Sequence, residues 1–369
     1  MQSNRIFFFS AKTQHENLGD AVINRELLRE LTKAGRVEMC EGGMPDDFLA
    51  FVKVPGIHAH ASTGAFYLLL LKTAIAALFK RRQQLYYVLN PGGFSGGVSG
   101  IGYLRQAFLI FMYMLLNLLN VRVVRLGASA GPYSASRLRI EKLKTALMHK
   151  NTVRDTVSLD YLKQHGFPEA SLFPDWAYML DKASMDSGSP LFGGRGYSVL
   201  SFRSEPGKPG YDAAIEHHLD ALISETPQLA QQPWACVSQV DFDVARNAQL
   251  AAHLAARGIN AVCQSDLREP EYFRIYRHAQ YVFSNRLHVL LFALRQGAVA
   301  YAMVDPAINT KIVGIYRDMG LQELIIDITR PTTPSMLKAR ASFEPEVDAI
   351  FQAKQAEIRR QLQLVLQGA

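Results

Sequence analysis

The sequence predicts an α/β protein made of two doubly wound, Rossmann-like domains that face each other across a cleft. Short apolar segments alternate with segments of helical periodicity along both halves of the chain. This order is typical of parallel sheets covered by helices. A chain of 369 residues is too long for one compact core, so two domains are expected. Residues 181–196 are rich in serine and glycine and contain Pro190, which is typical of a linker. The expected domains are therefore 1–184 and 185–342.

The first half contains four predicted strands, each with a helical segment after it. The strands are short and apolar, whereas each helix repeats its apolar residues every three or four positions. In chain order the elements are strand Ile6–Ser10, helix Asp20–Lys33, strand Leu85–Asn90, helix Gly102–Leu119, strand Val121–Leu126, helix Ser134–His149, strand Thr152–Arg154 and helix Ser158–Gln164.

The second half repeats the pattern and ends in a long helix. Residues 343–369 are amphipathic and should pack back onto the body. The preceding elements are strand Tyr197–Arg203, helix Tyr211–Ser224, strand Trp234–Val240, helix Phe242–Arg257, strand Asn260–Gln264, helix Pro270–His278, strand Gln280–Ser284, helix Leu287–Gly297 and strand Ala298–Val304.

Charge and cysteine usage restrict the partners and the compartment. The net charge of +7 indicates anionic partners. The basic residues are dispersed, so no nucleic acid is expected, and phosphorylated small molecules or an anionic membrane surface fit equally well. Cys40, Cys236 and Cys263 are widely spaced and should be buried thiols in a reducing compartment. No signal peptide is recognised at the amino terminus, which favours the cytoplasm.

Two strongly apolar segments, 66–79 and 107–119, bear on membrane contact. Both are shorter than the roughly 20 residues that span a bilayer, so we expect buried or partly buried helices. The alternative is a helix pair that lies on the inner face of the membrane beside Lys80, Arg81 and Arg82.

The most informative segment is Ser284–His288, where a strand ends and a helix begins. Helix N–H groups at such a junction favour anions. Arg286 adds bidentate recognition of phosphate or carboxylate, and His288 adds a proton that can move near neutral pH. Taken alone, the pair is better explained as an arginine bound to a carboxylate and a histidine that caps its own helix, and it is the rest of the chain that favours a functional site.

Other polar and glycine-rich segments follow the remaining strands. Gly19 allows close backbone approach after the first strand, and Asp20 is either a helix cap or a base for a sugar hydroxyl. The Gly92-Gly93 turn resembles a binding loop more than a P-loop. The other candidates at strand ends are Asn17, Ser129, Arg154, Arg203, Ser284, Leu287 and Lys311. Since carboxyl ends of parallel strands share one edge, these groups should line one cleft suited to phosphates and a carboxylate.

In order and spacing, these segments resemble the polysaccharide pyruvyl transferase family. The resemblance runs from about Phe7 to Leu321. It rests on Asn17–Asp20, Gly92-Gly93, Gly127–Pro132, Arg154-Asp155 with Ser158, Pro174-Asp175, Arg286–His288 and Lys311. Two departures, Phe94 after the glycine pair and Ala128-Ser129-Ala130 where a glutamine is frequent, lie on the expected acceptor side.

The resemblance implies a fold like that of GT-B glycosyltransferases, with no metal and no cofactor. It also implies transfer of a pyruvyl group from phosphoenolpyruvate to a sugar as a cyclic ketal, the acceptor being a nucleotide sugar or a lipid-linked saccharide. His288, Asp20 and Arg286 would then be catalytic. Arg154 and Lys311 would bind the donor, in a pocket of cations and helix N–H groups that suits phosphoenolpyruvate.

Two alternatives remain open from the sequence. One is a nucleotide-sugar-dependent glycosyltransferase on the same fold, with Glu269 or Glu271 holding the ribose. The other is a non-catalytic, membrane-associated assembly component built around the two apolar helices.

Overall fold

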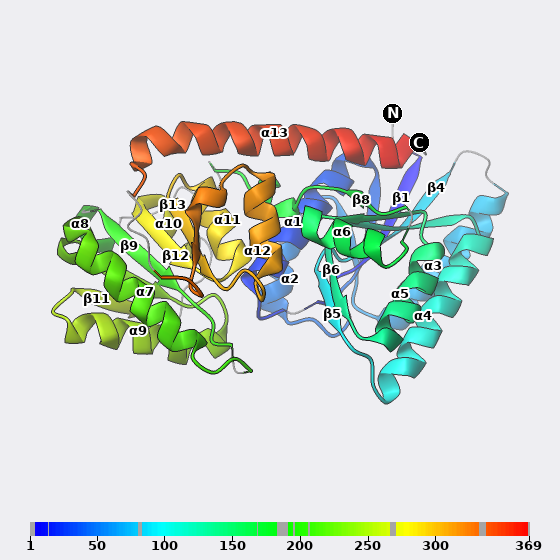
Figure 1. The fold of residues 1–369 in the computed structure, drawn as a ribbon. Coiled ribbons are helices and arrows are strands. Elements are labelled where there is room, and N and C mark those ends of the chain that lie inside the picture. Colours follow the sequence, from blue (N-terminus) through cyan, green and yellow to red (C-terminus); the bar gives the residue numbers. More distant parts are fainter. Residues whose placement is uncertain are drawn as a thin grey trace. The chain divides into compact units, whose positions relative to one another are not determined.

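A computed structural model describes residues 4–13, 15–79, 83–167, 169–182, 191–194, 196–205, 207–265, 271–331 and 337–367 (Figure 1). The chain divides into two compact units. Unit 1 comprises residues 1–176 with 357–369, and unit 2 comprises residues 177–356. The last helix, α13 (Arg340–Gln367), contributes to both units.

Unit 1 is built on a parallel sheet with the strand order β3-β2-β1-β4-β6-β7-β8, and β5 pairs with β6. Its elements are β1 (Arg5–Ser10), α1 (Leu18–Ala34), β2 (Arg36–Cys40), α2 (Asp46–Val52), β3 (Ile57–His60), α3 (Thr63–Leu78), β4 (Gln84–Leu89), β5 (Gly93–Gly96), α4 (Ile101–Leu118), β6 (Val121–Tyr133), α5 (Ala135–Ala146), β7 (Lys150–Val153), α6 (Thr156–Gln164) and β8 (Ser171–Leu172). The sequence did not predict β2, α2 or β3.

Strand β6 is longer than predicted. The expected strand ended at Leu126, but pairing continues to Tyr133 after a register shift between Arg125 and Ala128. Gly127, inside the shifted segment, has a φ of +73°, which a glycine adopts without strain. The predicted glycine turn is likewise a short strand, in which Gly93 lies opposite Ser129. The two glycine segments are therefore neighbours in unit 1.

One face of the unit 1 sheet carries α3 and α4. Because side chains alternate along a strand, Leu85 and Tyr87 point to the same face. They pack with Phe66, Leu70 and Leu116 in one buried cluster. This contact covers one side of each helix and positions both on the sheet.

As expected, α3 and α4 are partly buried. Each helix buries a single stripe against the sheet, while large apolar side chains on the opposite side are exposed. Among the described residues, α4 is long and apolar enough to cross a membrane by length and composition, with 22% of its 18 residues buried. Lys80, Arg81 and Arg82 lie outside the described residues.

Unit 2 has the parallel strand order β11-β10-β9-β12-β13-β14. Its elements are β9 (Tyr197–Ser201), α7 (Tyr211–Glu225), α8 (Pro227–Gln231), β10 (Trp234–Val237), α9 (Val244–Ala256), β11 (Ala261–Gln264), α10 (Glu271–His278), β12 (Ala279–Ser284), α11 (Leu287–Arg295), β13 (Val299–Val304), α12 (Thr310–Asp318) and β14 (Ile325–Asp327). Short 3-10 helices lie at Trp176–Met179, Leu191–Gly194, Asp241–Asp243 and Gln322–Leu324.

The core of unit 2 surrounds β12 and β13, both of which are almost completely buried. The first part of α13 packs here through Phe343, Val347 and Phe351, and its last part buries Ile358 and Leu362 in unit 1. All three cysteines are free thiols. Cys40 and Cys236 are buried as expected, but Cys263 is exposed because it lies on the edge strand β11.

Candidate active site

Each sheet reverses its strand order once, and most of the predicted site residues lie at or just after the ends of the strands beside those reversals. The exceptions are Ser129 in β6, Arg154 after β7 and Lys311 after β13. In unit 2 the order reverses between β9 and β12, and in unit 1 between β1 and β4. In open α/β sheets the carboxyl ends of such strands leave a crevice where ligands bind. Each unit therefore has one topological switch point where a ligand is expected.

In unit 2, Asn285 joins the two strands at the switch point. Its Oδ1 accepts from the Arg203 N–H at 2.9 Å, and its Nδ2 donates to the Arg203 carbonyl at 2.8 Å. Ser284 Oγ donates to the Ser201 carbonyl and accepts from the Arg286 N–H at 2.9 Å. Ser284 is completely buried and so fixes the turn. To contact substrate, as predicted, Ser284 Oγ would have to break one of these two hydrogen bonds.

Arg286 is the N-cap of α11, and its guanidinium reaches a carboxylate that the sequence did not indicate. It forms an ion pair with Asp243 and lies over the Phe242 ring, with 5.0 Å between Cζ and the ring centroid. Asp243 is fully buried, and its Oδ2 has no hydrogen-bond partner among the described residues, nor does Arg286 Nε. Burial raises the pKa of Asp243, while Arg286 opposes that shift. The pair is thus a buried ion pair with unused polar atoms.

His288 and Lys311 begin the two helices after neighbouring strands. His288 lies in the first turn of α11, is nearly buried, and stacks on Phe292 with ring centroids 6.0 Å apart. Lys311 is half-buried in the first turn of α12. Asn309, the residue that caps this helix, accepts from the Tyr211 hydroxyl at 2.9 Å.

The same Tyr211 hydroxyl accepts from Asn285 Nδ2 at 3.4 Å. This chain of bonds connects the ends of β9 and β12 to the start of α12. Arg203, Arg286, His288 and Lys311 all lie at this edge of the unit 2 sheet. The Arg203 side chain also forms an ion pair with Glu205.

In unit 1, Asn90 connects the two strands at the switch point, as Asn285 does in unit 2. Its Nδ2 donates to the carbonyls of Ser10 at 3.1 Å and Lys12 at 3.0 Å, across the switch point. Its Oδ1 is buried without a hydrogen-bond partner among the described residues. A Cβ on Gly92, two residues later, would meet nothing within 4 Å, so the backbone here borders open space. Both asparagines follow a strand directly, a position that the sequence pattern could have indicated.

The start of α1 differs from the prediction in one respect. Asn17, not Asp20, is the N-cap, and its Oδ1 accepts from the Gly19 N–H at 3.0 Å. A cap precedes the first helical residue, and α1 begins at Leu18. Asp20 is therefore half-buried in the first turn, where the helix N-terminus stabilises its negative charge. Leu287 is the first residue of α11 and is also half-buried.

Arg154 does not project freely from the end of β7. Its Nη1 donates to Asp175 at 2.6 Å, and its Nε donates to Ser129 Oγ at 2.6 Å. Ser129 in turn donates to Asp155, which caps α6 through the Ser158 N–H at 2.7 Å. Burial raises the pKa of Asp155, and its hydrogen bonds oppose the shift. Arg154 and Ser129 thus belong to a buried network that ties β6 to β7.

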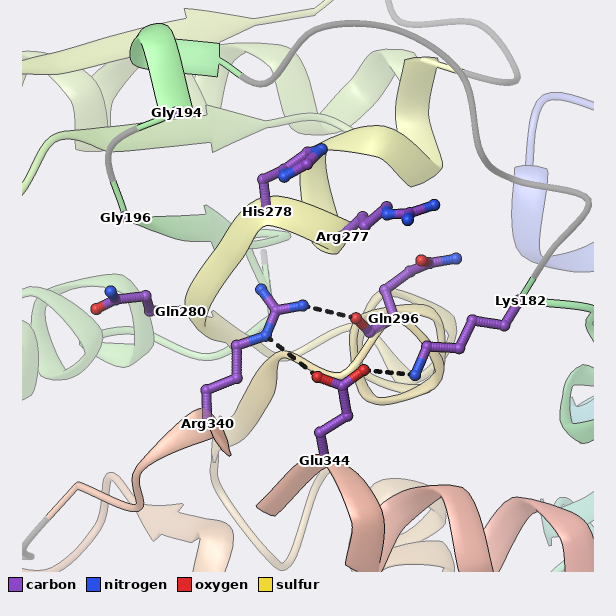
Figure 2. A pocket seen from close by; sticks show the side chains of 9 residues that line it. All are labelled: Lys182, Gly194, Gly196, Arg277, His278, Gln280, Gln296, Arg340 and Glu344. Carbon is purple, nitrogen blue, oxygen red and sulfur yellow. Dashed lines mark hydrogen bonds and ion pairs between the residues drawn. The ribbon is translucent and has the colours of Figure 1, made fainter. Parts of the chain in front are cut away.

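A cavity of about 790 Å³ in unit 2 lies at the opposite edge of the sheet (Figure 2). It is bordered by Gly196, just before β9, and by Gln280, at the start of β12. Glu344 there accepts from Lys182 at 2.5 Å and lies 3.8 Å from Arg340, as the dashed lines show. None of the predicted site residues lines this cavity, and its ion pairs hold the start of α13.

No group of three or more His, Cys, Asp or Glu side chains in the described part of the chain is arranged to hold a metal ion. Arginine and lysine side chains and helix N–H groups, which lie at the carboxyl edge of the unit 2 sheet, are groups that bind anions in proteins.

Two Rossmann-like units, each with one switch point, define a GT-B-type enzyme fold. Anabaena HepE, solved in complex with UDP, is similar with a TM-score of 0.57 and 11% identity over 99% of this chain and all of that one. UDP-GlcNAc 2-epimerase from Methanocaldococcus jannaschii gives a TM-score of 0.52 at 10% identity, covering 98% of this chain and 99% of that one. O-GlcNAc transferase from Thermobaculum terrenum gives 0.50 at 11%, covering 99% and 64%. At such identities the likeness shows the fold alone.

The sequence profile of the polysaccharide pyruvyl transferase family matches residues 17–304. The chain belongs to this family, as the order of its motifs indicated. No curated protein matches the sequence.

Proposed function

We propose that this protein transfers the pyruvyl group of phosphoenolpyruvate to a sugar of a cell-surface polysaccharide or its precursor. Two sugar hydroxyls add to C2 of the donor, and the bond from C2 to the phosphate oxygen breaks. Of the two hydroxyl protons, one ends on the former methylene carbon and the other leaves with phosphate. The product is a cyclic pyruvate ketal, and the balance needs no metal, oxidant or cofactor.

The observation that carries this proposal is the set of cations at the carboxyl edge of the unit 2 sheet. Phosphoenolpyruvate concentrates a phosphate and a carboxylate on few atoms. Arg286, Arg203 and Lys311, with the N–H groups of two helix starts, are suited to such a ligand. The buried and unused Nε of Arg286 is a donor that a phosphate oxygen could accept from.

His288 is the proposed acid, because it lies in the first turn of the helix that Arg286 caps. Protonation of the methylene carbon gives an oxocarbenium-like centre at C2, which the sugar hydroxyl attacks. The cations stabilise the charge that builds up on the departing phosphate.

Unit 1 is the proposed acceptor side. Asp20 would take the proton of the attacking hydroxyl, while Asn17, Gly19, Gly92 and Gly93 supply backbone that can approach a sugar closely. Arg154 and Ser129 contribute through their network, which positions the segment beside β5. The free thiols are consistent with a reducing compartment, and we place the reaction in the cytoplasm.

The test is incubation with phosphoenolpyruvate and a panel of nucleotide sugars and lipid-linked saccharides. Phosphate release and the mass of the acceptor are followed together. A pyruvyl ketal formed in step with phosphate supports the proposal, and His288→Ala should abolish both signals. Phosphate release without any acceptor product would show a phosphatase instead.

A nucleotide-sugar-dependent glycosyltransferase is the second candidate, favoured by the fold shared with HepE, which was solved with UDP. The acidic residues considered for the ribose cannot be placed, since Glu269 and the Glu271 side chain lie outside the described residues. Release of UDP from a UDP-sugar, with phosphoenolpyruvate untouched, would establish this candidate.

A further inference from the structure

One side of unit 1 exposes an unusual amount of apolar surface. Of fifteen large apolar side chains exposed in the described part of the chain, twelve lie on α3 with its C-cap, on α4 or on α5. They are Leu68, Ile75, Leu78, Phe79, Ile101, Tyr103, Leu104, Phe108, Phe111, Met114, Leu118 and Leu143. We call this surface the docking face. Contiguous apolar surface on this scale marks an interaction site.

The docking face is continuous along the helices. Leu104, Phe108 and Phe111 follow the i, i+4, i+7 spacing of one helix side and are 73%, 58% and 60% exposed. Leu68 and Ile75 form the corresponding stripe on α3, and exposed Lys72 lies between them. Both helices share one buried cluster against the sheet, and α4 packs beside α5.

The charges of the docking face have a single sign. Neither α3 nor α4 contains an acidic residue. The single acidic residue of α5, Glu141, is 1% exposed and bound to three cations. The exposed charges of the three helices, all of whose residues the structure describes, are therefore basic: Lys72, Arg105, Arg139 and Lys142.

We propose that the docking face rests on the surface of an anionic lipid bilayer. Apolar side chains would enter the boundary between headgroups and acyl chains, while the basic side chains contact anionic headgroups. A second copy of the chain is a poor occupant, because two such faces would bring like charges together with no exposed carboxylate between them.

Insertion of α4 across the bilayer would break contacts that hold unit 1 together. Met112, Tyr113 and Leu116 are buried against the sheet. Gln106 accepts from the Lys144 ammonium at 3.1 Å, which ties α4 to α5. A helix held on one side and apolar on the other lies at the membrane surface.

The position of α4 connects this contact to the proposed function. The helix starts at Ile101, which is 83% exposed, five residues after β5 ends at Gly96. The glycine segment of the acceptor side therefore lies next in sequence to the docking face. Vesicle binding itself does not depend on the proposed reaction, and it can be measured without donor or acceptor.

The experiment measures sedimentation of the full chain with phosphatidylcholine vesicles, with and without phosphatidylglycerol. Binding should require phosphatidylglycerol and weaken as salt rises. Lys72→Gln with Arg105→Gln should reduce partitioning about 25-fold, since each cation contributes about fivefold near an anionic surface. Phe108→Ser with Phe111→Ser should reduce it about 100-fold, at roughly tenfold for each aromatic ring lost.

The matched control replaces two exposed cations elsewhere, Lys163 and Arg317, by Gln. It removes the same charge and should leave binding unchanged. Equal losses of binding in the Lys72 and Arg105 variant and in the Lys163 and Arg317 control, or no binding to anionic vesicles, would overturn the proposal. So would protein that resists alkaline carbonate extraction, since that indicates a spanning helix. A dimer that Phe108→Ser and Phe111→Ser dissociate, without vesicle binding, would identify a second copy as the occupant.

Discussion

Replacing Asn285 by Ala should lower both the stability of unit 2 and its affinity for donor. Asn285 is nearly buried and satisfies the N–H and the carbonyl of Arg203. Each backbone group left unpaired costs about 1–2 kcal/mol, so the variant should lose about 2–4 kcal/mol. For a unit of this size, that corresponds to a fall of roughly 5–15 °C in its thermal midpoint.

The functional effect should exceed the loss of stability. Without the two hydrogen bonds from Asn285, the Arg203 backbone is no longer held beside Arg286, so both arginines are less well ordered. We expect KM for phosphoenolpyruvate to rise about tenfold or more, since a small displacement at a binding constellation is costly. KM is measured by phosphate release at a temperature where the variant is folded.

Tyr316→Phe provides the matched control in the same unit. The Tyr316 hydroxyl donates to the Ala300 carbonyl at 2.9 Å, near the start of β13 and away from the carboxyl edge. The control should lose about 1–2 kcal/mol of stability while KM stays unchanged. The reasoning fails if Asn285→Ala leaves KM unchanged, or if both variants raise KM equally.

The remaining predictions concern the ion pair, the acid, the ligand and pH. His288→Ala should abolish turnover with little change in thermal midpoint. Arg286→Ala should abolish turnover and also cost about 3–5 kcal/mol of stability, because Asp243 is left buried and unpaired. Asp243→Asn in the Arg286→Ala background should restore stability but not turnover, as melting curves and phosphate release would show. Because burial already raises the folded pKa of Asp243, the instability of Arg286→Ala should grow as pH rises above about 4, the unfolded value; a flat pH profile would contradict this. Phosphoenolpyruvate should raise the thermal midpoint of the wild type, and EDTA should leave turnover intact; a strict requirement for a divalent metal would refute the metal-free reaction. Burial alone would raise the pKa of Glu141, but neighbouring cations lower it to about 2, so unit 1 should lose stability as pH falls from 4.5 towards 2, and Glu141→Gln should flatten that dependence in acid titrations.

The sequence was sufficient for the architecture and for the edge of the sheet at which the candidate site residues lie. Alternating apolar runs predicted β1, β4, β9 and β12, and a polar residue directly after such a run must lie at the carboxyl edge of a parallel sheet. The position of Arg286 and His288 followed from this local rule. The segment 36–60 escaped prediction because Glu38, buried and bound to Arg36 and His60, interrupts the apolar pattern of β2.

Tertiary structure alone decided what each polar group contacts. Asp243 reaches Arg286 from 43 positions away, and Asp175 reaches Arg154 from 21. Such pairs are set by the packing of neighbouring strands and leave no periodic signal. The sequence could not show which side of α4 is exposed, for a similar reason. Periodicity reports which side chains are apolar, whereas burial depends on whether another element covers them, and in the described structure nothing covers the outer side of α4.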